Sequence, residues 1–231
     1  MFAKFKAQLR RNKLRKLGIE PTTQRNDQIL FLGERSGVWP VLDSTLKNKN
    51  LTVYSFGLGN NISWELDLIN RYDVKVFAFD PTPASVDWLA EQKLPQTLHF
   101  QAIGLADYCG ELSFYIPRRL GRFNYSVVNR GGKYPDQTIN CQVKDLATLC
   151  EENDHQHIDI LKLDIEGSEM SALPDILDSG ISIDKLLIEF HYNYKGISYS
   201  DTIALIQRLQ SLGYELFWLS DRAYEFGFIR R

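Results

Sequence analysis

The feature that most constrains the fold is a regular alternation of short apolar runs with amphipathic stretches, which begins at Leu51. Strand-like runs occupy residues 51–57, 74–80, 97–104, 158–164 and 182–192, and stretches with helical periodicity at 62–71, 84–93, 166–177 and 200–213 separate them. Strands that are apolar throughout are buried on both faces, which is typical of a parallel sheet covered by helices on both sides. The sequence therefore predicts a Rossmann-like α/β fold.

The end of the chain departs from this alternation. Residues 214–220 and 223–231 are apolar runs separated by Asp221-Arg222, which predicts a terminal antiparallel hairpin that adds an antiparallel edge strand. We expect helix 166–177 to be interrupted at Pro174 and helix 200–213 to be capped by Ser200. Residues 111–117 form an extra strand outside the central repeat, whereas 138–143 and 146–152 form a strand–helix pair.

Residues 1–50 precede the alternation and are predicted to form a separate segment. Residues 1–16 carry seven basic side chains and no acid, with apolar residues loosely on one side and a stop at Gly18, which predicts a basic amphipathic helix. We divide the chain into a basic helix with its lead-in over 1–50 and an α/β domain over 51–231. The basic helix could cap the domain, mediate self-association or contact an anionic membrane surface.

The charge balance bears on the class of partner. The 27 Lys+Arg and 29 Asp+Glu give a net charge of −2, and without the seven basic residues of 1–16 the remainder carries −9. So acidic a body is unsuited to general nucleic-acid binding. Cys109, Cys141 and Cys150 match neither a zinc site nor a redox pair, and no apolar run approaches the ~20 residues of a membrane span. The expected location is the cytoplasm.

Two strand ends indicate a nucleoside site. Gly57-Leu58-Gly59 follows the first strand directly, and Asp80 ends the second strand 21 residues after Gly59. Glycines let a ligand approach the backbone, and an acid at this place can accept both ribose hydroxyls. A dinucleotide site has a third glycine where this chain has Ile62. The bulky side chain favours a ligand without a pyrophosphate, such as S-adenosylmethionine (SAM), over a nicotinamide cofactor.

Five segments resemble the FkbM-like family of methyltransferases in order and spacing: VYSFGLGNNISWELDLI, VFAFDPTP, FQAIGLADYCGELSFY, IDILKLDIEGSEMSALPDIL and LLIEFHY. The resemblance covers about residues 50–192, and implies a seven-stranded sheet, SAM as methyl donor and O-methylation. It implies cofactor contacts from Gly57, Leu58, Gly59, Asp80, Pro81 and Ile103, the last beside the adenine. The chain departs from the family's first motif, roughly DxGxNxG. Ser55 stands where the motif has its acid, Gly59 where it has Asn, and Asn61 where it has the last Gly.

Two further strand ends supply candidate catalytic groups. Asp164 ends the fourth strand, and Glu189 and His191 lie on one side of the fifth strand's end. A carboxylate–imidazole pair is a suitable general base for an alcohol acceptor. The same trio could hold Mg²⁺ or Mn²⁺, but a metal-free base is preferred and no metal ligand is assigned. Glu166 and Glu169 are expected to favour the start of the following helix electrostatically.

Residues 118–135 form a long loop that could select the acceptor. It contains Arg118, Arg119, Arg122, Arg130 and Lys133 among aromatic and amide side chains. Arginine forks bind carboxylate or phosphate, and Tyr and Asn suit sugar hydroxyls. The sequence predicts a SAM-dependent O-methyltransferase acting on a hydroxyl of an anionic or sugar-containing small molecule. The alternatives are a catalytically silent SAM-binding module and, less favoured, a nicotinamide dehydrogenase.

Overall fold

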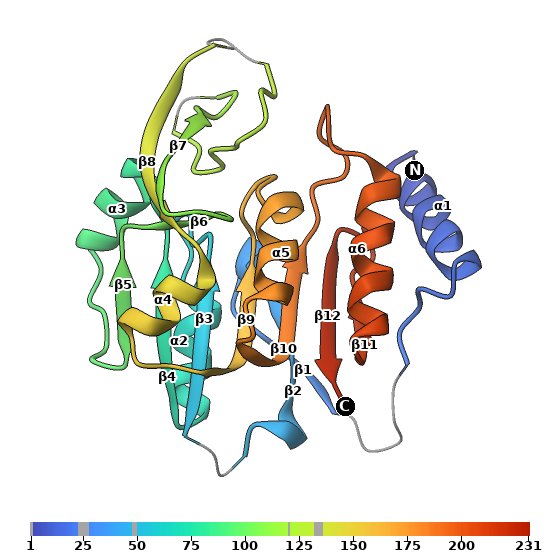
Figure 1. Ribbon diagram of the computed structural model, residues 1–231, viewed down its shortest axis with the longest axis horizontal. Coiled ribbons are helices and arrows are strands. Elements are labelled where there is room, and N and C mark those ends of the chain that lie inside the picture. The colour runs from blue at the N-terminus through green and yellow to red at the C-terminus, as the bar shows by residue number, and fades with distance from the viewer. Residues whose placement is uncertain (1, 23–27, 48–49, 120, 132–135) are drawn as a thin grey trace.

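The computed structural model describes residues 2–22, 28–47, 50–119, 121–131 and 136–231. Its centre is a seven-stranded sheet with the strand order β11-β12-β10-β9-β3-β4-β5 (Figure 1). These strands are β3 (Leu51–Phe56), β4 (Val74–Phe79), β5 (Leu98–Gln101), β9 (His157–Leu163), β10 (Ser182–Glu189), β11 (Tyr214–Leu219) and β12 (Glu225–Arg230). The predicted α/β class and the predominantly parallel seven-stranded sheet are confirmed.

The terminal hairpin differs from the prediction in one detail. The antiparallel strand is β12, which pairs with β10 on one side and with β11 on the other. The edge strand β11 consequently runs in the same direction as the other strands. Phe226 and Phe228 of β12 are fully buried, which explains why this strand lies inside the sheet and not at its edge.

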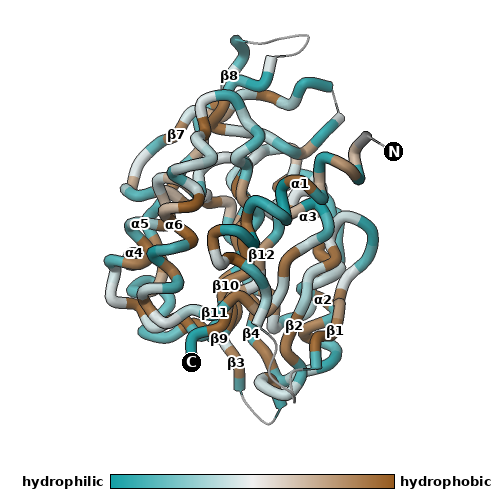
Figure 2. Tube along the Cα trace, turned by 90° about the vertical axis from the view of Figure 1, so that its right-hand side faces the viewer, coloured by the Kyte–Doolittle hydropathy of each residue, from teal (hydrophilic) through white to brown (hydrophobic). Residues whose placement is uncertain are grey.

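Helices cover both faces of the sheet, as expected for apolar parallel strands. One face packs against α4 (Leu146–Glu152), α5 (Glu169–Asp178) and α6 (Tyr199–Ser211), whose buried side chains share a core with the strands. The other face packs against α2 (Ser63–Arg71), α3 (Pro83–Ala90) and a small hairpin of β1 (Ile29–Leu32) and β2 (Trp39–Leu42). Figure 2 shows the hydrophobic residues concentrated along the strands between these layers.

Two expectations about helix ends were wrong. Helix α5 continues through Pro174, and its buried residues Leu173 and Ile176 keep this segment packed on the sheet despite one lost backbone hydrogen bond. Helix α6 is capped by Ser198, whose hydroxyl accepts a hydrogen bond from the Asp201 N–H at 3.3 Å, and not by Ser200. Ser200 instead shares a hydrogen bond with the Ser198 hydroxyl.

A second sheet stands above the carboxyl ends of the central strands (Figure 1). It has the order β6-β8-β7, from β6 (Gly104–Leu105), β7 (Gly110–Tyr115) and β8 (Thr138–Lys144). The position of β7 outside the central sheet agrees with the prediction. Although β8 leads directly into α4, it also belongs to this smaller sheet. Residues 118–119 and 121–131 are therefore held above the edge where open α/β sheets bind ligands.

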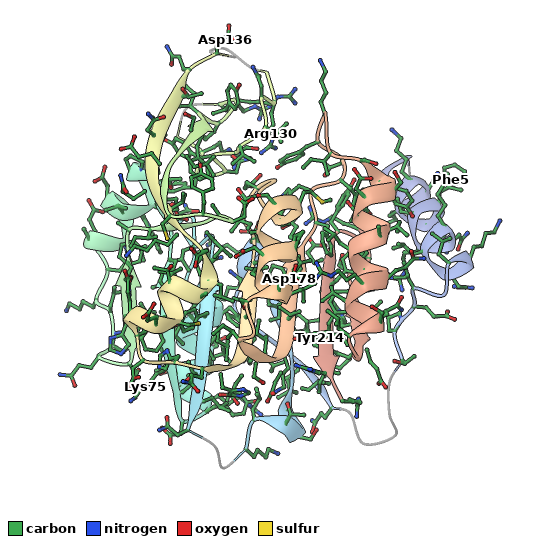
Figure 3. All side chains as sticks on the ribbon, in the orientation of Figure 1. Phe5, Lys75, Arg130, Asp136, Asp178 and Tyr214 are labelled. Atoms are coloured by element: carbon green, nitrogen blue, oxygen red, sulfur yellow. The ribbon has the colours of Figure 1, made fainter. Side chains whose placement is uncertain are left out.

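The first helix, α1 (Phe2–Lys16), packs beside α6 at the edge of the molecule (Figure 1). Leu14 is fully buried in the core, whereas Phe5 and Leu9 are 64% and 47% exposed. Figure 3 shows Phe5 pointing away from the body of the protein. Two short 3-10 helices, η1 (Arg35–Gly37) and η2 (Asp43–Thr45), flank β2. Among the described residues, none of the helices has the length and apolar character needed to cross a bilayer.

Candidate active site

A cavity of about 860 Å³ opens at the carboxyl edge of the central sheet. Its walls come from the segments that follow β3, β4, β9 and β10, from η1, from the β11–β12 turn and from loop residues 118–119 and 121–125. Most of the residues predicted for the site line it, namely Gly57, Leu58, Gly59, Asp80, Pro81, Asp164 and Glu189. Ile103 and His191 are outside the lining.

Gly57 lies where β3 and β9 come closest together. Its φ is +80°, and a Cβ atom at this position would lie 1.7 Å from the carbonyl oxygen of Asp164. Only glycine combines this backbone conformation with so close an approach. The Asp164 N–H donates to the carbonyl of Phe56 at 3.1 Å, which joins the two strand ends directly. The first glycine of the motif therefore fixes the floor of the cavity and the position of Asp164.

Asp80 holds the glycine turn in place. One of its carboxylate oxygens accepts hydrogen bonds from the backbone N–H groups of Leu58 and Gly59, both at 3.0 Å. The other oxygen accepts from the N–H and the hydroxyl of Thr82, at 3.0 and 2.7 Å. The side chain is nearly buried but borders the cavity. Asp80 thus links the ends of β3 and β4 at the place predicted for a ribose.

The residues after β5 are arranged differently from the expectation for the adenine contact. Ile103 packs against the core on the α4–α6 face, whereas Gly104 and Leu105 line the cavity. A Cβ on Gly104 would lie 2.9 Å from the Cγ of Pro81. The small residue therefore lets β6 approach the Asp80-Pro81 turn.

Ser55, at the position where the motif usually carries an acid, is part of a buried charged cluster. Its hydroxyl donates to the Glu65 carboxylate of α2 at 2.6 Å and accepts from the Lys162 ammonium of β9 at 3.3 Å. Lys162 Nζ also lies 3.5 Å from Glu65 Oε1, and both side chains are at most 5% exposed. The acid missing from β3 is thus supplied by α2 and is paired with a lysine.

His191 lies among three carboxylates behind the cavity wall. Its Nδ1 is 2.8 Å from Oε1 of Glu169, which is fully buried, and Nε2 lies 3.6 Å from Glu166 and 3.9 Å from Asp164. The backbone of Glu166 has a positive φ of 50°, which turns its side chain to this cluster. Glu166 and Glu169 therefore belong to the site itself, which goes beyond the role expected for them at the helix start.

Burial and neighbouring charges shift the pKa of each of these groups. Burial alone lowers the pKa of His191, but Glu169, Glu166 and Asp164 together raise it to about 10, so the imidazole is a cation at neutral pH. Burial raises the pKa of Asp164 and of Glu166, against the opposing effect of His191. Burial and the charge of Asp164 raise the pKa of Glu189 to about 7.

Glu189 lines the cavity, whereas His191 does not. Glu189 Oε1 is 3.4 Å from the guanidinium of Arg222, which also pairs with Glu225 of β12. Of the two clusters of potential metal ligands among the described residues, the one at this site consists of Asp164, Glu166 and His191, whose ligand atoms lie within 4.8 Å of one another. In this cluster of potential metal ligands, Glu166 therefore takes the position that was predicted for Glu189.

The loop after β7 reaches over this carboxylate cluster. Arg130 donates to Glu166 at 2.9 Å and its guanidinium lies 4.2 Å from the centre of the Tyr194 ring. The Tyr194 hydroxyl also bonds to Glu166. Figure 3 shows Arg130 between the raised β7–β8 sheet and α5. The sequence indicated Arg130 only as one of the cations of the acceptor loop and did not indicate Tyr194, because the contacts of both with Glu166 form only in the folded chain.

Three other arginines of the loop border the cavity: Arg118, Arg119 and Arg122. Each is exposed, and none forms an ion pair with a residue that the structure describes. Lys133, the remaining cation predicted for this loop, lies outside the described residues. The mouth of the cavity is therefore positively charged, while its inner wall carries carboxylates.

This chain is similar to several known proteins in sequence or in a structural alignment. It is 24% identical over 172 residues to the hexuronic acid methyltransferase AglP of Haloferax volcanii, a match that covers 74% of this chain and 69% of AglP. Among solved structures, the antibiotic-resistance methyltransferase Kmr aligns with a TM-score of 0.38 at 11% identity, covering 87% of this chain and 98% of Kmr. A transferase from Pyrococcus horikoshii aligns with a TM-score of 0.37 at 10% identity, covering 97% and 82%. Residues 5–216 match the family described as the methyltransferase FkbM domain, and the chain therefore belongs to that family of methyltransferases.

Proposed function

We propose that this methyltransferase transfers the methyl group of SAM to a hydroxyl group of an acidic sugar. The observation that carries the proposal is the charge arrangement of one cavity. Three arginines without an ion-pair partner among the described residues border its mouth, and carboxylates with raised pKa values line its inner wall. Such a cavity can bind an anionic acceptor and remove a proton from its hydroxyl group.

The residues around the glycine turn fit SAM. Gly57 lets the backbone of Asp164 approach closely at the edge of the cavity, and Asp80 borders the cavity at the expected ribose position. Ser168 also lines the cavity, and its buried hydroxyl has no hydrogen-bond partner among the described residues, which leaves it free for a ligand. Leu58, Gly59 and Pro81 complete this half of the proposed cofactor site. When bound, SAM would supply a methyl group whose carbon an oxygen nucleophile can attack, with the neutral thioether S-adenosylhomocysteine as the leaving group.

Glu189 is the proposed proton acceptor, with Asp164 beside the reacting methyl group. A carboxylate whose pKa is about 7 is well matched to general-base catalysis near neutral pH. His191 is cationic and lies behind Asp164 and Glu166, so its proposed role is to hold these carboxylates in position. A divalent cation bound by Asp164, Glu166 and His191 is less favoured, because His191 is protonated and Arg130 already pairs with Glu166.

The relative AglP is named for a hexuronic acid, which supports an acidic sugar as the acceptor. A carboxylate on the sugar would meet the arginines of the loop, while the neighbouring Asn124 and Tyr125, which also line the cavity, suit hydroxyl groups. A neutral sugar would leave the three guanidinium groups without a counter-charge.

The experiment is a mass measurement of the product. The protein is incubated with SAM and either a glucuronic acid glycoside or the matching glucoside, and a gain of one methyl group on the acid alone is the expected result. Arg118→Ala with Arg122→Ala should raise KM for the acid while leaving the Kd of S-adenosylhomocysteine (SAH) unchanged, with the exposed Lys93→Ala as control. Equal turnover of both sugars would contradict the acidic acceptor. Binding of SAH without turnover of any acceptor would favour a silent binding module.

A further inference from the structure

A buried lysine borders the proposed cofactor site. Lys162 is the second-last residue of β9 (His157–Leu163), is 5% exposed and has its Nζ 5.6 and 5.9 Å from the ring centres of Trp39 and Trp64. A buried ammonium is costly unless polar partners compensate for its lost hydration. The described residues offer it only two oxygens, from Ser55 and Glu65. Because an ammonium has three N–H donors and Lys162 lines the cavity, one donor remains for a ligand.

A second cation borders the same end of the cavity. Arg35 belongs to η1, has a positive φ of 55° and has no ion-pair partner among the described residues. The turn that carries it is fixed on the start of α2. The Gly33 N–H donates to Asp67 at 2.8 Å, and Asn61 Nδ2 donates to the carbonyl of Glu34 at 2.9 Å. A strained, non-glycine residue held this firmly beside a cavity indicates a binding role.

The order of the strands in the sheet indicates which part of SAM would lie at this end of the cavity. With the ribose at Asp80 after β4 and the methyl group at Asp164 after β9, the methionyl part lies near the end of β3, the strand between them. Ser55, Phe56 and Gly57 form that strand end, and Ser55 is paired in register with Lys162. The methionyl group carries one ammonium and one carboxylate, so the charge at this place decides which of them is held.

We infer that Lys162, supported by Arg35 at the open side, binds the carboxylate of the methionyl group of SAM. An acid at the Ser55 position would present a negative charge suited to the ammonium of the cofactor. In this chain the residue is a neutral serine, and the nearby Glu65 is already paired with Lys162. Because Glu65 is occupied by Ser55 and Lys162, this end of the pocket offers the remaining ammonium donor of Lys162, which suits the carboxylate and not the ammonium of the cofactor. This inference rests on the proposed SAM site.

Calorimetry on the full chain with two ligands tests the inference. SAH carries the carboxylate, and S-adenosyl-3-thiopropylamine keeps the amine but lacks the carboxylate. We expect the wild type to bind SAH about 10- to 100-fold more tightly, the range for hydrogen bonds to charged groups. Equal affinities would overturn the inference. Failure of the wild type to bind either ligand would instead overturn the proposed function.

Variants separate ligand binding from structural support. Lys162→Met with Glu65→Gln removes both members of the buried pair, so neither charge is left alone. This double variant should lose the preference for SAH and bind the amine as before, whereas Glu65→Gln alone should keep the preference. An equal loss for both ligands would show a purely structural role. The control is Lys75→Met at the opposite end of the sheet (Figure 3).

Arg35→Ala gives an independent test at an exposed turn, where folding is not at risk. It should weaken SAH binding by about three- to tenfold, as expected for a partly hydrated charge pair, and should leave the amine unaffected. Circular dichroism checks that each variant is folded. If the double variant does not fold, the wild-type preference and Arg35→Ala decide the outcome, and an unchanged preference in Arg35→Ala would limit the site to Lys162.

Discussion

The two halves of the cavity are built by different physical means. In the half formed by β3 and β4, glycine backbone and the four hydrogen bonds of Asp80 set the shape. In the half formed by β9, β10 and α5, the shape depends on the charged side chains around His191, of which Glu169 is buried and Asp164 and Glu166 are partly exposed. The first half is fixed by conformations that few residues can adopt, and the second by a balance of charges.

This difference separates binding from chemistry. A site fixed by backbone geometry binds a constant ligand without any change of protonation. A site whose carboxylates have raised pKa values can exchange protons near neutral pH. Substitutions in the first half should therefore change cofactor affinity, and substitutions in the second half should change turnover and its pH dependence.

The largest effect is expected from Gly57→Ala. The added Cβ would collide with the carbonyl of Asp164, so the ends of β3 and β9 must separate and SAH binding should be lost. Gly180→Ala is the matched control, because Gly180 has a similar φ of +77° but no atom within 4 Å of an added Cβ. The control should cost about 1–2 kcal/mol in the free energy of unfolding, from backbone strain alone. Calorimetry compares SAH binding by the two variants, and thermal unfolding compares their stability. Retained SAH binding by Gly57→Ala would contradict the predicted collision with Asp164.

Asp164→Asn should spare binding and remove turnover. The amide keeps the size of the side chain but not its charge beside the reacting group, so kcat should fall by about 10²- to 10⁴-fold. The Kd of SAH should change less than about threefold. The exposed Asp87→Asn serves as control, measured in the same assay with radiolabelled SAM. A large loss of SAH affinity would move Asp164 from the catalytic half to the cofactor half.

The pH dependence of kcat sharpens the role of Glu189. A general base acts in its deprotonated form, so kcat should be low in acid and should rise as the pH passes through about 7. In Glu189→Gln this rise should disappear. His191→Gln removes the cation near Asp164 and Glu189, and should therefore shift the rise to higher pH and reduce kcat by about tenfold at pH 7. A profile unchanged by His191→Gln would contradict its positioning role.

The sequence was most informative where local pattern alone determines the structure. Alternating apolar runs predicted five of the strands, and the turn at Asp221-Arg222 predicted the hairpin that supplies the other two. Gly57 and Asp80 were recognisable because strand ends, glycine turns and acids lie within a single βαβ unit. The interior position of β12 was not predictable in the same way. It depends on which strand of a hairpin buries Phe226 and Phe228 against β10, and neither strand shows this in its own periodicity.

The charged half of the cavity required the folded chain. Glu169 and His191 are 22 residues apart, and Arg130 and Glu166 are 36 apart, so their pairing follows from how the sheet and loop pack. One pattern in the sequence does indicate a buried charged pair. Lys162 interrupts an otherwise apolar buried strand, and Glu65 lies between Trp64 and Leu66 in α2. A charge at each of two core positions indicates a buried pair.

The smallest effect is expected from the basic helix α1, which contacts the turn that carries Arg222 of the charged half. Arg10 Nε donates to the carbonyl of Arg222 at 2.9 Å, and Arg11 pairs with Asp221 at 3.1 Å, so α1 supports the turn that places Arg222 beside Glu189. Arg10→Ala with Arg11→Ala should shift the pH profile slightly and change kcat by less than about threefold, because these ion pairs are partly exposed. SAH binding should be unchanged. A loss of SAH affinity would show that α1 also supports the cofactor half, and would remove the distinction between the two.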